Sequence, residues 1–96
     1  MQFVRFRHKG LRHLREDANA KGVPQAMADK LRKILFALET AETLEQLGRF
    51  SGWKLHPLKG NLKGFWSLTA TGNWRLIFGY AEETNTASDI DLIDYR

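Results

Sequence analysis

The residues from Leu55 to Arg75 combine cationic and aromatic side chains without a single acidic residue. These 21 residues include two Trp, two Lys, one His and one Arg. A run of positive charge that has no counter-charge is costly to fold against itself, so it usually faces an anionic partner. Single-stranded RNA suits such a run best, because it is anionic and its unpaired bases are free to stack on aromatic rings. This stretch therefore indicates contact with nucleic acid.

His56 is the residue of this stretch best able to exchange protons, because an imidazole changes its charge near neutral pH. Its position before Pro57 is equally consistent with a histidine that is hydrogen-bonded within a turn. Lys59 and Lys63 follow in a loop that holds two glycines. Glycine lets the backbone approach a phosphate closely and the lysines add charge, although Lys63 could also be an ordinary solvated residue.

Arg75 follows a Gly72-Asn73 pair that separates two runs of aromatic and β-branched residues. Such a pair predicts a hairpin, because glycine supplies the positive φ that a two-residue turn needs. Side chains alternate along a strand, so Arg75 should project from the face opposite to Trp74. There it could grip a phosphate with two hydrogen bonds, or it could be a plain surface arginine. Asn73 could read a base edge, but turn formation accounts for it more simply.

Hydrophobic patterning predicts the elements that would position these residues. We expect a short strand around residues 3–6, a short helix over 8–17, a longer helix over 24–40 and a helical turn at 43–47. Strands should follow over 65–71 and 74–80 and around 90–93. The longer helix should begin near Pro24 and carry an apolar stripe. The members of the stripe are Ala26, Met27, Leu31, Ile34, Leu35 and Leu38. The chain is thus predicted to be α+β, with an N-terminal strand, two helices and then an antiparallel β-sheet.

Composition limits the class of protein. The 96 residues are expected to form one domain, 1–96, near the lower size at which a chain buries its own core. There is no Cys, so neither disulfides nor thiolate metal sites are available. No apolar run reaches membrane-spanning length and the first residues hold no signal-like apolar segment, so we expect a cytoplasmic protein without membrane contact.

The net charge of +4 is unevenly distributed. Residues 1–63 carry 13 Lys or Arg against six Asp or Glu, whereas residues 64–96 carry two against five. The basic excess in the first two-thirds fits a nucleic-acid binder, and it fits a soluble cationic surface about equally well.

Five short motifs occur in order along the chain. They are His8-Lys9-Gly10-Leu11, Leu55-His56-Pro57-Leu58-Lys59-Gly60, Gly64-Phe65-Trp66-Ser67, Gly72-Asn73-Trp74-Arg75 and Asp94-Tyr95. With these motifs at matching spacing, the chain resembles the HigB group of the RelE/ParE toxin superfamily, the small toxins of bacterial type II toxin–antitoxin modules. The resemblance covers nearly the whole chain and implies a RelE-like fold.

The resemblance also implies an activity and partners. It implies an endoribonuclease that cleaves translated mRNA in the ribosomal A site and so inhibits translation, held inactive by a helix-turn-helix, HigA-like antitoxin. Cleavage would be metal-independent and need no cofactor, because the ribose 2′-OH attacks the adjacent phosphate. That reaction needs a base, cations near the phosphate oxygens and an acid for the leaving 5′-oxygen.

Site residues follow from the positions that match the family motifs. The implied catalytic residues are His56, Lys59, Arg75, Asp94, Tyr95 and Arg96, and the implied RNA contacts are Lys54, Lys63 and Asn73. Asp94 would contact the 2′-OH or orient His56, and Tyr95 would stack on a base beside the cut. Arg96 departs from the Asp-Tyr-His ending common in this group. Its guanidinium stays protonated, so it could neutralise phosphate charge but could not serve as an ordinary base.

Two other functions remain open from the residues alone, a ParE-like poison of DNA gyrase without catalysis and a plain basic nucleic-acid-binding module. The proton-transfer group near cationic residues favours cleavage over both. A metal site made of Asp89, Asp91 and Asp94 is rejected, because strand alternation places Asp94 on the face opposite to the other two.

Overall fold

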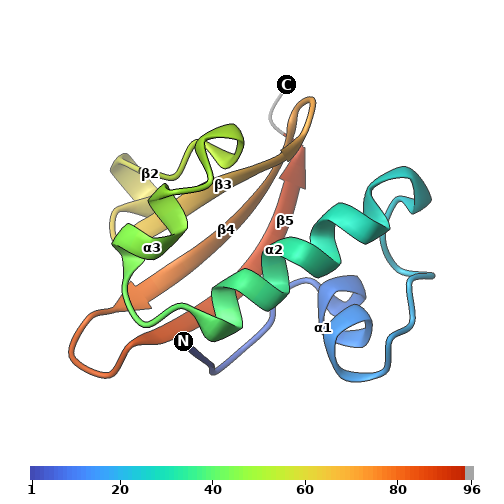
Figure 1. The fold of residues 1–96 in the computed structure, drawn as a ribbon, viewed down its shortest axis with the longest axis horizontal. Helices are drawn as coiled ribbons and strands as arrows, with labels where there is room; N and C mark the ends of the chain where they lie inside the picture. Colours follow the sequence, from blue (N-terminus) through green and yellow to red (C-terminus); the bar gives the residue numbers. More distant parts are fainter. Residues whose placement is uncertain (95–96) are drawn as a thin grey trace.

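The computed structural model describes residues 1–94, which form a layer of helices against one β-sheet (Figure 1). The strands are β1 (Gln2–Phe3), β2 (His56–Pro57), β3 (Phe65–Thr71), β4 (Trp74–Ala81) and β5 (Thr86–Asp94). The helices are α1 (Lys9–Glu16), α2 (Ala28–Thr40) and α3 (Leu44–Gly48), with short 3₁₀ turns η1 (Gln25–Met27), η2 (Ser51–Trp53) and η3 (Gly60–Leu62). The predicted α+β class is confirmed.

The five strands lie in the order β1-β5-β4-β3-β2. From β2 to β5 each pair is antiparallel, whereas β1 runs parallel to β5. The predicted hairpin between β3 and β4 is present, and Gly72 takes a φ of 52° in its turn. At the C-terminal end of β5, Asp94 pairs with Trp74, so the last described residue lies beside the β3–β4 turn (Figure 1).

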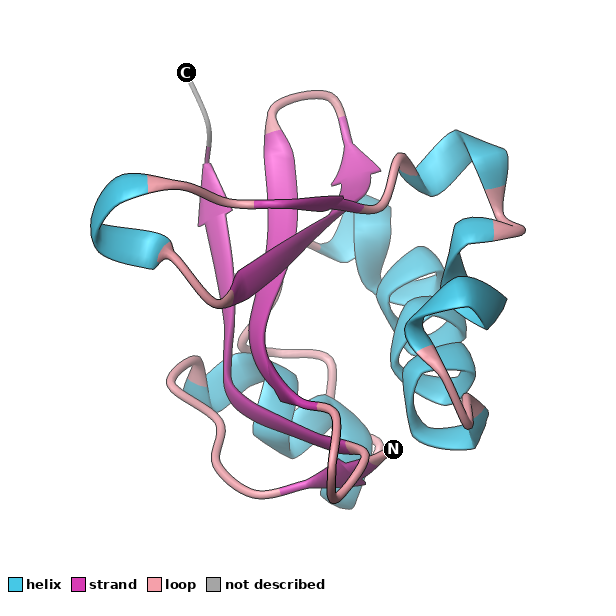
Figure 2. Ribbon diagram, turned by 90° about the vertical axis from the view of Figure 1, so that its left-hand side faces the viewer, coloured by secondary structure: helices cyan, strands magenta, loops and turns pink. Residues whose placement is uncertain are grey.

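One face of the sheet carries the core. Helices α2 and α3 lie on this face (Figure 2), and the apolar stripe of α2 packs against alternate residues of the strands. From α2 the stripe contributes Leu31, Ile34, Leu35 and Leu38, and from the sheet come Leu68, Leu76, Phe78 and Ile90. Because these side chains are almost fully buried, their packing holds the sheet against the helices.

The longer helix begins later than predicted. The α-helix starts at Ala28 rather than near Pro24, because Pro24 has a ψ of 128° and only the 3₁₀ turn η1 lies between them. A 3₁₀ turn has three residues per turn, so it rotates the apolar face relative to an α-helix. Ala26 is therefore exposed, contrary to its predicted place in the stripe, and Ala28 is buried instead.

A β-bulge in β5 places Asp89 beside the arginines that follow β1. The register shifts opposite Phe78, and Asp89 takes a left-handed φ of 50°. Its carboxylate accepts a 2.5 Å hydrogen bond from Nε of Arg5 and lies 3.9 Å from Nε of Arg7. This hydrogen bond from Arg5 is the main cause that lowers the pKa of Asp89 below its usual value.

We expect Asp89→Asn to lower the melting temperature by a few degrees at neutral pH. A lowered carboxyl pKa stabilises the fold above the unfolded value near 4, and that stabilisation is lost as pH falls through the folded value. The difference between parent and variant should therefore shrink towards pH 2–3 in thermal scans. Asn tolerates the left-handed backbone as well as Asp, so strain does not confuse the comparison. Asp29→Asn, which removes an exposed ion pair with Arg32, should change little.

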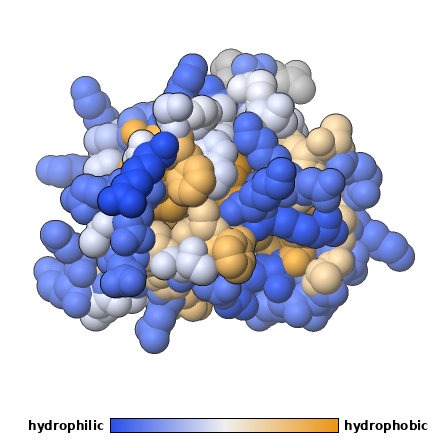
Figure 3. All heavy atoms as spheres, in the orientation of Figure 1, coloured by the Kyte–Doolittle hydropathy of each residue, from blue (hydrophilic) through white to orange (hydrophobic). Residues whose placement is uncertain are grey.

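The surface is mostly hydrophilic on the side seen in Figure 3, with hydrophobic side chains gathered in patches near its centre. Within residues 1–94 the large hydrophobic side chains that are exposed are Val4, Phe36 and Phe50. No helix in this part of the chain has both the length and the apolar character needed to cross a membrane.

Candidate functional site

The face of the sheet opposite to α2 and α3 holds two of the predicted catalytic residues. His56 pairs with Ser67, Ser67 with Ile77 and Ile77 with Asp91, so these four residues form one row across the sheet. Paired residues of neighbouring strands point to the same face, and neither Ser67 nor Ile77 belongs to the core under the helices. His56 therefore lies on the face opposite to α2 and α3, which we call the open face; its side chain is exposed, although Ser67 and Ile77 at the centre of this face are buried.

Arg75 lies on this open face too, because it is two residues from Ile77 on β4. It pairs with Thr69 on one side and Ile93 on the other. Strand spacing and rise place its Cα about 12 Å from that of His56, two strands across and two residues along. The two side chains therefore project from the same face, two strands apart. The predicted direction of Arg75 is thus supported by the register.

Arg75 is anchored by the hairpin that carries it. Its Nη1 donates to the carbonyl of Gly72 at 2.8 Å and to that of Trp74 at 3.2 Å. These bonds use one nitrogen of the guanidinium fork, and they hold the group at the end of the sheet where β3 turns into β4. A guanidinium held in this way loses less side-chain conformational entropy when it binds a phosphate.

His56 has a defined tautomer. Its Nδ1 lies 2.9 Å from the carbonyl oxygen of Lys54, and a carbonyl can only accept, so Nδ1 carries the proton and donates. The left-handed backbone of Lys54, with a φ of 49°, turns this carbonyl towards the ring. In this tautomer Nε2 carries the lone pair, and within residues 1–94 no hydrogen bond to it is found on this exposed side chain. This is the form in which a histidine accepts a proton from a substrate hydroxyl.

The predicted lysines surround the loop after β2. Lys59 precedes the 3₁₀ turn η3 and Lys63 follows it, and both are exposed, as is Lys54. Gly60 and Gly64 have positive φ values of 65° and 95°, so the loop depends on glycine at these two positions. Asn73 is exposed in the β3–β4 turn. The three lysines therefore place exposed positive charge beside β2 and the start of β3, and Asn73 adds a polar side chain at the other end of β3.

Asp94 is further from His56 than predicted. It pairs with Trp74, on the face opposite to Arg75, and lies three strands and three residues from His56. This corresponds to roughly 17 Å between their Cα atoms. The expectation that Asp94 could orient His56 directly is therefore wrong, whereas a contact with substrate at the end of the sheet is compatible with its position. Tyr95 and Arg96 lie outside the described residues.

Two residues of the open face escaped the sequence analysis. The guanidinium carbon of Arg7 lies 5.7 Å from the ring centroid of Phe65, a cation–π arrangement. Phe65 pairs with Gly79 and is two residues from Ser67, so it shares the face of His56. A Cβ at Gly79 would lie 3.7 Å from the Phe65 ring and 2.9 Å from Oγ of Ser88, which shows how tightly this end of the face is packed. No sequence pattern links Arg7 to Phe65, because they meet only through the parallel pairing of β1 with β5.

The described part of the chain, residues 1–94, contains no group of three His, Cys, Asp or Glu side chains placed to hold a metal ion. Its open face instead offers one imidazole with a free lone pair, a guanidinium on the same face and exposed lysines at the border. Such a set can accept a proton and stabilise negative charge on a phosphate.

Comparison with known proteins gives a consistent family match. Residues 4–95 match the family model described as a RelE-like toxin of the type II toxin–antitoxin system HigB. A protein of Proteus vulgaris named endoribonuclease HigB is 43% identical over 75 residues, which cover 78% of this chain and 80% of that protein.

Solved structures with a similar fold are more distant in sequence. YafQ from Escherichia coli strain BL21(DE3) has a TM-score of 0.60 at 15% identity, covering 94% of this chain and 87% of its own. A YoeB/ParE toxin from Agrobacterium tumefaciens has a TM-score of 0.56 at 18% identity, covering 100% and 99%. The toxin–antitoxin complex RelBE2 from Mycobacterium tuberculosis gives 0.50 at 18% identity, covering 99% and 96%. At such identities the likeness concerns the fold alone.

Proposed function

The chain belongs to the HigB-like family, the RelE-like toxins of type II toxin–antitoxin systems, and we propose that it is an endoribonuclease that cleaves mRNA on translating ribosomes. The family resemblance inferred from the sequence is confirmed by the match over residues 4–95. We further propose that residues 1–96 form a single domain that acts in the cytoplasm, where translated mRNA is found.

The observation that carries this proposal is the shared face of His56 and Arg75. In the proposed reaction Nε2 of His56 takes the proton of a ribose 2′-OH, and the freed oxygen attacks the adjacent phosphorus. The bond from phosphorus to the 5′-oxygen breaks, the 5′-oxygen takes a proton from water as it leaves, and a 2′,3′-cyclic phosphate is formed. Arg75 and Lys59 stabilise the negative charge that builds on the phosphate oxygens. These groups perform the step without a metal ion or other cofactor.

The remaining predicted residues complete the proposal at the two borders of the face. Lys54, Lys63 and Asn73 contact the RNA backbone or a base edge, and Asp94 contacts substrate at the end of β5. Tyr95 stacks on a base. Arg96 supplies charge to the phosphate in place of the histidine common in this group, so it acts at every physiological pH.

The open site supports dependence on the ribosome. His56 is exposed, so we expect the protein alone to hold an RNA strand only loosely. Positioning of the 2′-OH in line with the phosphate is worth a large part of the rate, and the ribosome provides it by fixing the mRNA in the A site. Because the matching family consists of toxins from toxin–antitoxin systems, we also propose that a helix-turn-helix, HigA-like antitoxin holds the toxin inactive in the cell.

Inducible expression without antitoxin, followed by primer extension on a translated message, tests the proposal. We expect growth arrest and cuts within codons that disappear when translation is blocked. The same cuts on free RNA with purified protein should be weak. If protein synthesis continued while DNA supercoiling failed, a gyrase poison would be the correct function and the nuclease proposal would be wrong.

A further inference from the structure

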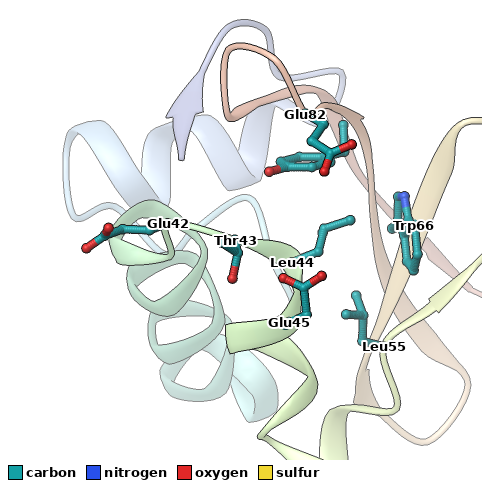
Figure 4. Close-up of a pocket in the computed structure, with 8 residues that line it drawn as sticks. Glu42, Thr43, Leu44, Glu45, Leu55, Trp66 and Glu82 are labelled. Atoms are coloured by element: carbon teal, nitrogen blue, oxygen red, sulfur yellow. The ribbon is translucent and has the colours of Figure 1, made fainter.

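A hollow of about 600 Å³ opens on the helix-bearing side of the sheet, between α3 and the turn that joins β4 to β5 (Figure 4). Leu44, Leu55 and Trp66 give it an apolar lining, and the carboxylates of Glu45 and Glu82 stand on either side of Leu44 (Figure 4). The complete lining is Glu42, Thr43, Leu44, Glu45, Leu55, Trp66, Tyr80 and Glu82. We call these eight residues the acidic hollow.

The charge of the acidic hollow is unusual for this protein. Three of its residues are Glu and none is Lys or Arg, although the chain has 15 Lys and Arg in total. None of the three carboxylates forms an ion pair within residues 1–94. Acidic residues elsewhere, such as Glu16, Asp29 and Asp89, do have arginine partners. The Met1 ammonium interacts electrostatically with Glu42, so Glu45 and Glu82 are the carboxylates of the hollow that have no cationic partner within residues 1–94.

The inner wall of the hollow is held in place. The hydroxyl of Tyr80 donates to Oδ1 of Asn85 at 2.8 Å, and Nδ2 of Asn85 donates to the carbonyl of Ala41 at 3.2 Å. These bonds tie β4 to the end of α2. Burial raises the pKa of Tyr80, and the charges of Glu82 and Glu45 raise it further, so both carboxylates act on the same wall. The hollow is thus preformed, which lowers the entropic cost of filling it.

The chemistry of the lining selects its occupant. RNA is repelled, because its phosphates would face carboxylates with no cation between them. A lysine or arginine side chain fits, since its aliphatic stem can pack on Leu44 and Leu55 while its charge lies between Glu45 and Glu82. The indole of Trp66 adds a favourable surface for a guanidinium. Arginine gains most from this combination, because its planar group both stacks and binds carboxylates in pairs.

We propose that the acidic hollow binds an arginine or lysine side chain from a basic segment of the antitoxin. This inference rests on the proposed pairing with an antitoxin, but it does not depend on RNA cleavage. The hollow lies on the helix-bearing face of the sheet and His56 lies on the opposite face, so this contact anchors the antitoxin without filling the catalytic face.

The test compares the binding of the antitoxin to the parent toxin and to a double variant of the toxin in which Glu45 and Glu82 are both replaced by Gln. The affinity should fall at least tenfold at 150 mM salt, and its dependence on salt should weaken, because charged contacts across an interface are lost. In the parent complex, carbodiimide labelling with glycine ethyl ester should be suppressed at Glu45 and Glu82 relative to the free toxin. Both substitutions are isosteric at exposed positions, and the growth arrest caused by free toxin should be unchanged.

Glu83→Gln is the matched control, because Glu83 lies in the same turn but outside the hollow. An equal loss of affinity in this control would show that net charge alone matters and would overturn the inference. Unchanged affinity and unprotected carboxylates in the double variant would overturn it too. Self-association of free toxin that the double variant abolishes would identify a second copy as the occupant instead. If the toxin bound its antitoxin through the hollow but did not cut RNA, the proposed endoribonuclease activity would be wrong and the inference about the hollow would stand.

Discussion

His56→Gln should lower cleavage of ribosome-bound mRNA by about 10²–10⁴, the range that general acid–base catalysis usually contributes. Glutamine keeps an amide NH that can donate to the carbonyl of Lys54, as Nδ1 of His56 does at 2.9 Å. It has no group that accepts a proton near neutral pH. The variant should therefore keep the local structure and lose the proton transfer. Primer extension on a translated message, with rates from single-turnover time courses, measures the effect.

His13→Gln is the control for this experiment. His13 lies on α1, where Nδ1 is 2.9 Å from Asp17, and the mechanism gives it no role. It should cleave at the parental rate. Equal melting temperatures for the parent and both variants would show that folding is intact. If His56→Gln cut as fast as the parent, the histidine would be a turn residue and another group would have to take the 2′-OH proton.

Part of the open face, namely the direction of Arg75 and the hairpin that carries it, could be predicted from the sequence because these features depend on neighbouring residues only. Alternation along one strand was enough to place Arg75 opposite to Trp74, and a Gly-Asn pair was enough to predict the hairpin. The tautomer of His56 could not be predicted, because it depends on the left-handed backbone of Lys54. A lysine carries no sequence signal for that conformation.

Features formed between distant segments were the ones missed. The contact of Arg7 with Phe65 and the ion pair of Arg5 with Asp89 both require β1 to pair with β5, a parallel pairing of the two ends of the chain. Asp94 was assigned a role towards His56 because both belong to motifs, but motifs give order along the chain rather than position across a sheet. Only the register revealed that two strands, β3 and β4, lie between them.

The first motif, His8-Lys9-Gly10-Leu11, is explained by packing rather than by chemistry. Nδ1 of His8 accepts a 3.2 Å hydrogen bond from the backbone NH of Leu11, so His8 caps the N-terminus of α1. Gly10 is buried against the backbone of Gly22. The motif therefore fixes where α1 begins and how closely it lies against the segment before α2.

Gly10→Ala should cost roughly 3 kcal/mol of folding stability, at the upper end of what overpacking usually costs. A Cβ at position 10 would lie 2.1 Å from the carbonyl oxygen of Gly22 and 2.5 Å from its carbon. Both are backbone atoms, so α1 must move away as a whole, and Leu11, which is 0% exposed, would move with it. The same Cβ would lie 2.8 Å from Cε1 of His8, so the cap would be disturbed as well.

Urea unfolding of Gly10→Ala and Gly52→Ala separates this packing effect from a general cost of replacing glycine. A Cβ at Gly52 would have no heavy atom within 4 Å, and Gly52 has no positive φ, so its substitution should change stability by no more than about 0.5 kcal/mol. We expect a clearly lower midpoint for Gly10→Ala only. Its toxicity should fall with the folded fraction and return at lower temperature, because no group of the proposed site is altered. Equal midpoints for the two variants would mean that α1 shifts without cost, and the close contact of Gly10 with Gly22 would not explain the motif.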